Sequence, residues 1–182
     1  MTGKLLLPDT ERLIADVCDS LDEVANAGSR LDRNPTTLIC AALKRRLDDY
    51  GEGLESASDR DGSKHEDERE FLYDFCSVVC EPKDRNIERY TFQVAVIGEI
   101  EWTGNLSKDF EKLMFADALV SFFAFPDWLK EHRPVSDIDF YSDVAARRVR
   151  HMSGRGIMPK PVFVIGAYSG ENRNFVKRII HD

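Results

Sequence analysis

Long hydrophobic runs are absent from this sequence. No stretch reaches the ~18 uninterrupted apolar residues expected of a membrane-spanning helix. The segment before Pro8 is also too short for the apolar core of a signal peptide. Together these absences predict a cytoplasmic protein without a membrane partner.

Cysteine and histidine are scarce and dispersed. The cysteines do not form the closely spaced pairs of a zinc finger, so in a reducing compartment they are expected to be small buried hydrophobic residues: Cys18, Cys40, Cys76 and Cys80. The four histidines stand singly, which argues against a histidine-rich metal site. Neither a phosphate-binding P-loop nor a serine-hydrolase motif is present.

The composition is that of a folded protein. The chain has 182 residues, of which 42% are hydrophobic and 32% charged, and this apolar content can offset the entropy lost on folding. We expect one domain spanning 1–182, with an N-terminal helical region over 1–50, a flexible acidic connection over 51–69 and an α/β core over 70–182.

Charge is unevenly distributed along the chain. The net charge is −8, yet the segment from Tyr141 onward carries eight basic and three acidic residues. An acidic protein is unsuited to coating nucleic acid indiscriminately, because such binding rests on phosphate neutralisation. A local basic surface stays possible in the C-terminal segment.

Hydrophobic periodicity predicts a mixed sheet between helices. Helical spacing is found over 9–27 and from Pro35 to Leu47, which gives an N-terminal helical pair. Further helices are expected from about Ser107 and over 136–150. Strands are expected at four places: 70–80, 90–102, 119–125 and 161–166. The order β-β-α-β-α-β predicts an α/β protein whose mixed central sheet is flanked by helices.

Three carboxylates occur where apolar strand residues are expected. Glu99 and Glu101 alternate with Ile100 and therefore point to one face of their strand, while Asp74 interrupts a hydrophobic run on the preceding strand. If the strands pair, these oxygens converge on a site suited to Mg²⁺ or Mn²⁺.

The same residues also allow a simpler interpretation. The two glutamates can lie at a solvent-facing strand end, paired with basic neighbours, and Asp74 can cap a turn. The candidate partners are Arg85, Arg89 and Lys108.

The segment from Glu70 to Phe125 resembles the PD-(D/E)XK restriction-endonuclease-like nucleases. The resemblance rests on Phe71-Leu-Tyr-Asp74, on Gly98-Glu-Ile-Glu-Trp102, and on Asp109-Phe-Glu-Lys112-Leu before an apolar strand. It covers about a third of the chain and implies a restriction-endonuclease-like core.

The resemblance assigns roles to individual residues. Asp74 and Glu99 correspond to the metal-binding acids, and the carbonyl of Ile100 is expected to complete the metal shell. Glu101 stands where the family usually has lysine, so it is either a metal ligand or a general base. Lys112 either supplies the missing cation or is an ordinary surface lysine. The implied activity is Mg²⁺- or Mn²⁺-dependent hydrolysis of DNA phosphodiester bonds.

Contacts with DNA would require a basic surface away from the carboxylates. The candidates are Arg147, Arg148, Arg150, Arg155 and Lys160. Basic residues at a solvated helix end, favoured by the helix dipole, are the simpler alternative.

Other functional interpretations remain open at the level of sequence. A homodimer formed through the N-terminal helices is compatible with nuclease activity. A non-catalytic protein- or nucleic-acid-binding module that retains the same fold is the main alternative. A metal-dependent phosphatase or another small-molecule hydrolase is a further one, which predicts a closed pocket.

Overall fold

The structure is a computed structural model that describes residues 8–27, 31, 33–50, 54–58, 73–80, 91–129, 136–155 and 161–182. Its helices are α1 (Thr10–Ala25), α3 (Pro35–Asp48), α4 (Leu106–Phe115) and α5 (Asp137–Gly154). Its strands are β1 (Leu54–Ser58), β2 (Phe75–Cys80), β3 (Thr91–Ile100), β4 (Ala118–Pro126), β5 (Val162–Ser169) and β6 (Asn174–Ile180).

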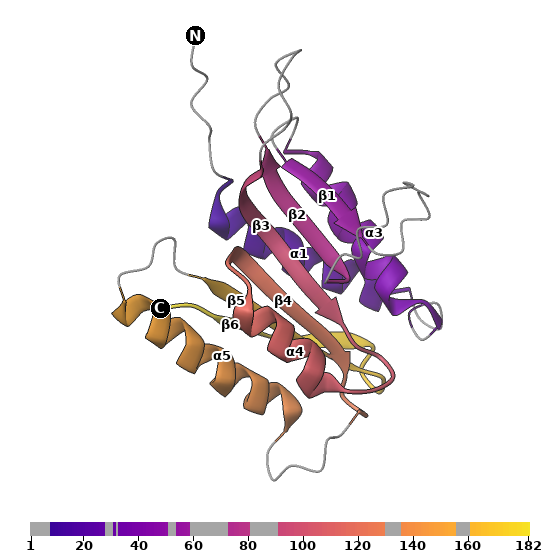
Figure 1. The fold of residues 1–182 in the computed structure, drawn as a ribbon. Coiled ribbons are helices and arrows are strands. Elements are labelled where there is room, and N and C mark those ends of the chain that lie inside the picture. Colours follow the sequence, from indigo (N-terminus) through magenta and orange to yellow (C-terminus); the bar gives the residue numbers. More distant parts are fainter. Residues whose placement is uncertain are drawn as a thin grey trace.

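All described strands belong to one mixed sheet in which spatial order follows chain order. The sheet has six strands in the order β1-β2-β3-β4-β5-β6 (Figure 1). β1, β2 and β3 form an antiparallel meander, β3, β4 and β5 run parallel, and β6 returns antiparallel to β5. The helices α4 and α5 form the two parallel connections, which confirms the predicted α/β class and mixed sheet.

Local sequence explains the helix starts. The Asp9 side chain accepts a hydrogen bond from the Glu11 amide at the start of α1, and Ser136 does the same for the Asp139 amide of α5. Pro35 occupies the first turn of α3, where its missing N–H costs nothing. The predicted helical pair is therefore confirmed.

Both edge strands differ from the sequence prediction. β1 falls in the segment that was expected to be a flexible connection, and β6 was not expected at all. In β6 only Phe175 is fully buried. An edge strand that pairs with only one neighbour and is exposed to solvent shows little hydrophobic periodicity.

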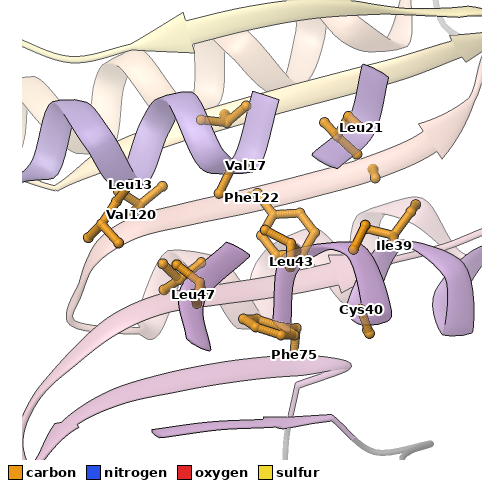
Figure 2. Close-up of a cluster of buried hydrophobic side chains, with 14 of the residues drawn as sticks. Leu13, Val17, Leu21, Ile39, Cys40, Leu43, Leu47, Phe75, Val120 and Phe122 are labelled. Carbon is orange, nitrogen blue, oxygen red and sulfur yellow. The ribbon is translucent and has the colours of Figure 1, made fainter. Parts of the chain in front are cut away.

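One face of the sheet is covered by α1 and α3. Leu13, Val17 and Leu21 of α1 and Leu43 and Leu47 of α3 belong to the same buried cluster as side chains of the sheet (Figure 2). The apolar sides of the N-terminal helices are thus used within the chain, and a homodimer stays an untested prediction.

The opposite face is covered by α4 and α5 (Figure 1). Phe110 of α4 and Tyr141 of α5 stack with a ring-centroid distance of 4.6 Å, and both contact Phe123 of β4. Within the described residues, no helix is long and apolar enough to cross a bilayer.

A glycine in β3 permits the closest packing in the sheet. Gly98 is paired with Phe75 of β2 on one side and with Phe122 of β4 on the other, and the two rings lie 6.2 Å apart. A Cβ atom at position 98 would lie 1.9 Å from the nearest atom of the Phe122 ring. Phe75 and Phe122 are both fully buried, so neither ring has room to move.

We expect Gly98→Ala to destabilise the protein strongly. The added methyl overpacks the core, and overpacking typically costs about 1–3 kcal/mol, with larger costs where side chains cannot relax. Urea denaturation measures the change. Gly154→Ala is the matched control, because nothing lies within 4 Å of a Cβ atom there and alanine favours the helix. Equal denaturation midpoints for the two variants would contradict this account of the packing.

Candidate functional site

A cleft of about 280 Å³ lies at the carboxyl end of β3. Its walls come from both faces of the sheet, with α3 on one side and α4 on the other. The lining residues are Arg33, Pro35, Thr36, Asp74, Glu99, Ile100, Glu101, Trp102, Thr103, Asp109 and Lys112.

Asp74 lies immediately before β2. The sequence placed it inside the strand, but β2 begins at Phe75. The Asp74 Oδ2 atom accepts a hydrogen bond of 2.8 Å from the Ile100 amide, which fixes the carboxylate beside the end of β3. Asp74 and Glu99 consequently line the same cleft.

Glu99 is a buried carboxylate. Only 2% of the residue is exposed, so the interpretation of Glu99 as a solvent-facing strand end is wrong. Strand alternation sends its side chain to the face opposite Gly98, toward α4. Burial, and then the charge of Asp74, raise the pKa of Glu99 to about 8.

Lys112 of α4 turns into the cleft. Its Nζ atom lies 3.1 Å from Glu99 Oε1 and 2.8 Å from Asp109 Oδ1. The contact with Glu99 is an ion pair without hydrogen-bond geometry, because Oε1 is buried and has no hydrogen-bond partner among the described residues. Burial disfavours the charged amine, but the attraction of the Asp109 and Glu99 carboxylates outweighs burial and raises the pKa of Lys112.

Of the other cations proposed to neutralise the glutamates, only Lys108 lies in the described part of the chain. Lys108 is exposed and makes no ion pair within the described part of the chain. Arg85 and Arg89 lie outside the described residues. Lys112 is therefore the cation that the structure places beside Glu99.

Glu101 is held by the turn that follows β3. Its Oε1 atom accepts hydrogen bonds from the amides of Thr103, at 2.7 Å, and Gly104, at 2.8 Å. Burial and a hydrogen bond with Asp109 raise the pKa of Glu101. Asp109 shows the reverse: burial opposes its ionisation, but bonds from Glu101 and Lys112 lower its pKa overall. The two carboxyl groups thus interact directly with each other.

These contacts correct the predicted set of three converging carboxylates. Across the described ranges, no group of three or more His, Cys, Asp or Glu side chains is arranged to hold a metal ion. Asp74 and Glu99 come together, whereas Glu101 is engaged with Asp109 and the turn.

The remaining pair still fits one divalent ion. Mg²⁺ is commonly bound in proteins by one or two carboxylates, with water and substrate phosphate completing its octahedron. The buried Glu99 Oε1 atom is ion-paired with Lys112 but lacks a hydrogen-bond donor among the described residues, and a metal ion would add a second positive charge there. Ile100 lines the cleft beside both acids.

The basic cluster of α5 lies away from the cleft. Since α5 connects the parallel strands β4 and β5, it runs antiparallel to them, and its C-terminal half lies near the start of β5 (Figure 1). The cleft lies at the opposite end of the strands. None of Arg147, Arg148, Arg150 and Arg155 lines it, and Lys160 lies outside the described residues.

Two charged cleft residues were given no role by the sequence analysis. Asp109 was part of the resembling segment, and its spacing of three residues from Lys112 on a helix could have suggested the ion pair. Arg33 directly precedes the Asn34-Pro35 start of α3. Its position in the cleft depends on how α3 packs on the sheet, which the sequence does not reveal.

Comparisons with known proteins add no relative. No protein-family model, no curated protein and no solved structure matches the chain significantly. Functional inference therefore rests on the geometry of the cleft.

We expect the stability of the metal-free protein to fall as pH rises from 4.5 to about 8. The pKa of Glu99 is about 8, against an ordinary value of 4.5, so the folded protein binds this proton more tightly than the unfolded chain. The stabilisation is complete below the lower value and disappears as pH passes the higher one. The slope is at most about 1.4 kcal/mol per pH unit.

Urea denaturation in EDTA across this pH range measures the effect. Glu99→Gln cannot ionise and should flatten the profile, whereas Glu171→Gln, an exposed control in the β5–β6 turn, should leave it unchanged. A wild-type profile as flat as that of Glu99→Gln would show that the Glu99 proton is not linked to folding.

Proposed function

We propose that the protein is a divalent-metal-dependent nuclease of the PD-(D/E)XK restriction-endonuclease-like type, acting on phosphodiester bonds of DNA. The observation that carries the proposal is the buried Glu99 oxygen without a hydrogen-bond donor, beside Asp74 in an open cleft. Protein interiors rarely retain such a group without a functional reason.

The order of elements supports the same proposal. An aspartate precedes β2, an antiparallel pair links β2 to β3, and β3 ends in Glu99-Ile-Glu101 before α4 and the parallel strand β4. This is the succession on which the resemblance was based. Fold alone does not determine function. The proposed nuclease function must therefore be argued from the chemistry of the cleft.

Under this proposal Asp74 and Glu99 hold the ion, with the Ile100 carbonyl as a further candidate ligand. When bound, the ion would lower the pKa of a water and neutralise charge on the scissile phosphate. Lys112 contributes a second positive charge next to Glu99. Glu101 lines the cleft beside Asp109, and its raised pKa suits a general base.

The proposal includes DNA as the binding partner and the reducing cytoplasm as the compartment. Cys18, Cys40 and Cys76 form no disulfide in the described structure, and in a reducing compartment cysteines stay in the thiol form. The α5 arginines lie outside the cleft, so they could contact only DNA that extends beyond it.

A non-catalytic binding module is the second candidate function. One observation favours it: Glu101 accepts two backbone hydrogen bonds and Lys112 bridges Glu99 and Asp109. A cleft that balances its own charges to this extent can persist without an ion.

Cleavage and metal binding distinguish the two candidates. In the presence of Mn²⁺ we expect wild-type protein to nick DNA, and Asp74→Asn and Glu99→Gln to fall to the level of a reaction without protein. Calorimetry should show Mn²⁺ binding. Free Mn²⁺ at 100 times its Kd should raise the free energy of unfolding of the wild type by about 2.7 kcal/mol. Neither variant should show this stabilisation.

Glu171→Gln is the control for the loss of a carboxylate, because Glu171 is exposed and does not line the cleft. It should cleave and bind Mn²⁺ like the wild type. Wild-type protein that neither binds Mn²⁺ nor nicks DNA would exclude the nuclease and leave the binding module.

A further inference from the structure

The start of α3 forms a wall of the cleft that differs in charge from the wall at α4. Arg33, Pro35 and Thr36 line the cavity from this side. The α3 helix has 14 residues, and a helix of this length carries a positive partial charge at its N-terminus. The acidic side chains Glu99, Glu101 and Asp109 line the same space.

The first turn of α3 has backbone donors without acceptors. The Asn34 side chain makes no capping hydrogen bond, although asparagine is among the best capping residues. Leu38 bonds back to the Asn34 carbonyl, but the amides of Thr36 and Thr37 donate to no residue in the described part of the chain. Such unpaired amides are the groups that bind phosphate at helix N-termini.

Arg33 adds a full positive charge to this turn. The residue is exposed and makes no ion pair with any described residue, despite the number of carboxylates in the cleft. A guanidinium can donate two parallel hydrogen bonds to a phosphate. The arginine is thus available for a ligand.

A second, independent feature also indicates a ligand in this cleft. Glu99 is 2% exposed, and its Oε1 atom has no hydrogen-bond donor in the described structure. Lys112 does not by itself balance the carboxylates that line the cleft, which favours a further cation, whereas the amides of the α3 turn favour an anion. A cation bound to a phosphate satisfies both requirements within one cavity.

We propose that Arg33 and the first turn of α3 form a phosphate-binding subsite that holds the DNA backbone at the cleft. This inference rests on the proposed nuclease function and specifies how its substrate is held. A cavity of about 280 Å³ is near the lower limit for small-ligand sites. The subsite is therefore expected to contact a phosphate group of the strand that is cut.

The subsite is tested by the affinity of a short fluorescent thymidine oligonucleotide, measured by anisotropy in Ca²⁺. Gel electrophoresis after the titration verifies that the probe is intact. Arg33→Ala should weaken binding about tenfold or more, since charge-assisted hydrogen bonds are lost. It should also reduce the slope of log K against log salt by about 0.7, the value for one phosphate contact on a single strand. Arg33→Lys should recover part of the affinity.

Asn34→Asp separates binding from folding. Aspartate is a good N-cap and suits the helix dipole, so this variant should be as stable as the wild type or more so. The same negative charge should repel phosphate and weaken oligonucleotide binding. Damage to the fold would lower both quantities, so opposite changes indicate a phosphate site.

Arg147→Ala is the matched control, because Arg147 is an exposed arginine on α5 outside the cleft. Equal losses for Arg33→Ala and Arg147→Ala, or unchanged affinity in Arg33→Ala, would overturn the subsite. That result would leave the nuclease proposal intact if Glu99→Gln still abolishes cleavage. Loss of binding in Arg33→Ala without any Mn²⁺-dependent cleavage by the wild type would retain the subsite and exclude the nuclease.

Discussion

The geometry of the cleft depends on the close approach of two phenylalanine rings to Gly98. Phe75 and Phe122 meet over this glycine, which sets how β2 and β4 flank the last residues of β3. Because side chains alternate along a strand, packing Gly98 against one face directs Glu99 to the other. The next amide, that of Ile100, donates to Asp74. Packing of an apolar core thereby determines where two carboxylates meet.

Charge within the cleft is balanced unequally. Asp109 is paired with Lys112, Glu101 accepts amide hydrogen bonds, and Asp74 accepts one from Ile100. Glu99 has only the undirected ion pair with Lys112, although it is the most deeply buried of these acids. The cost of burying a carboxylate falls when it is directly hydrogen-bonded. A bound cation would therefore stabilise Glu99 more than its neighbours.

Much of the fold could be predicted because its signals are local. Pro35 and Ser136 mark helix starts, and the apolar runs of β3, β4 and β5 belong to strands buried on both faces. β6 lacks that signal because an edge strand has one partner and exposes much of its surface. In β6, Ile179 is 47% exposed, so hydrophobicity alone did not reveal its position.

The site was only partly predictable because it depends on tertiary geometry. Alternation correctly indicated that Glu99 shares a face with Glu101, but the turn amides and Asp109 that hold Glu101 could not be inferred from strand spacing. The separation of the α5 arginines from the cleft could have been predicted from the order of the elements. A helix joining two parallel strands must run back along the sheet, which puts its end opposite the strand ends. Arg33 had no such signal, since its location depends on how α3 packs over the sheet.

The cleft combines elements from opposite faces of the sheet, and this arrangement limits which ligands suit it. A bare phosphate bound at α3 would meet the carboxylates of Glu99 and Glu101. A bare divalent cation bound at Asp74 and Glu99 would satisfy the acids but leave the amides of Thr36 and Thr37 and the Arg33 guanidinium without an anion. Each component alone leaves part of the cavity unsatisfied, whereas a phosphate and a cation bound together neutralise one another and contact both walls. Binding of the two should consequently be cooperative, as thermodynamic linkage requires when each ligand removes a repulsion that the other experiences.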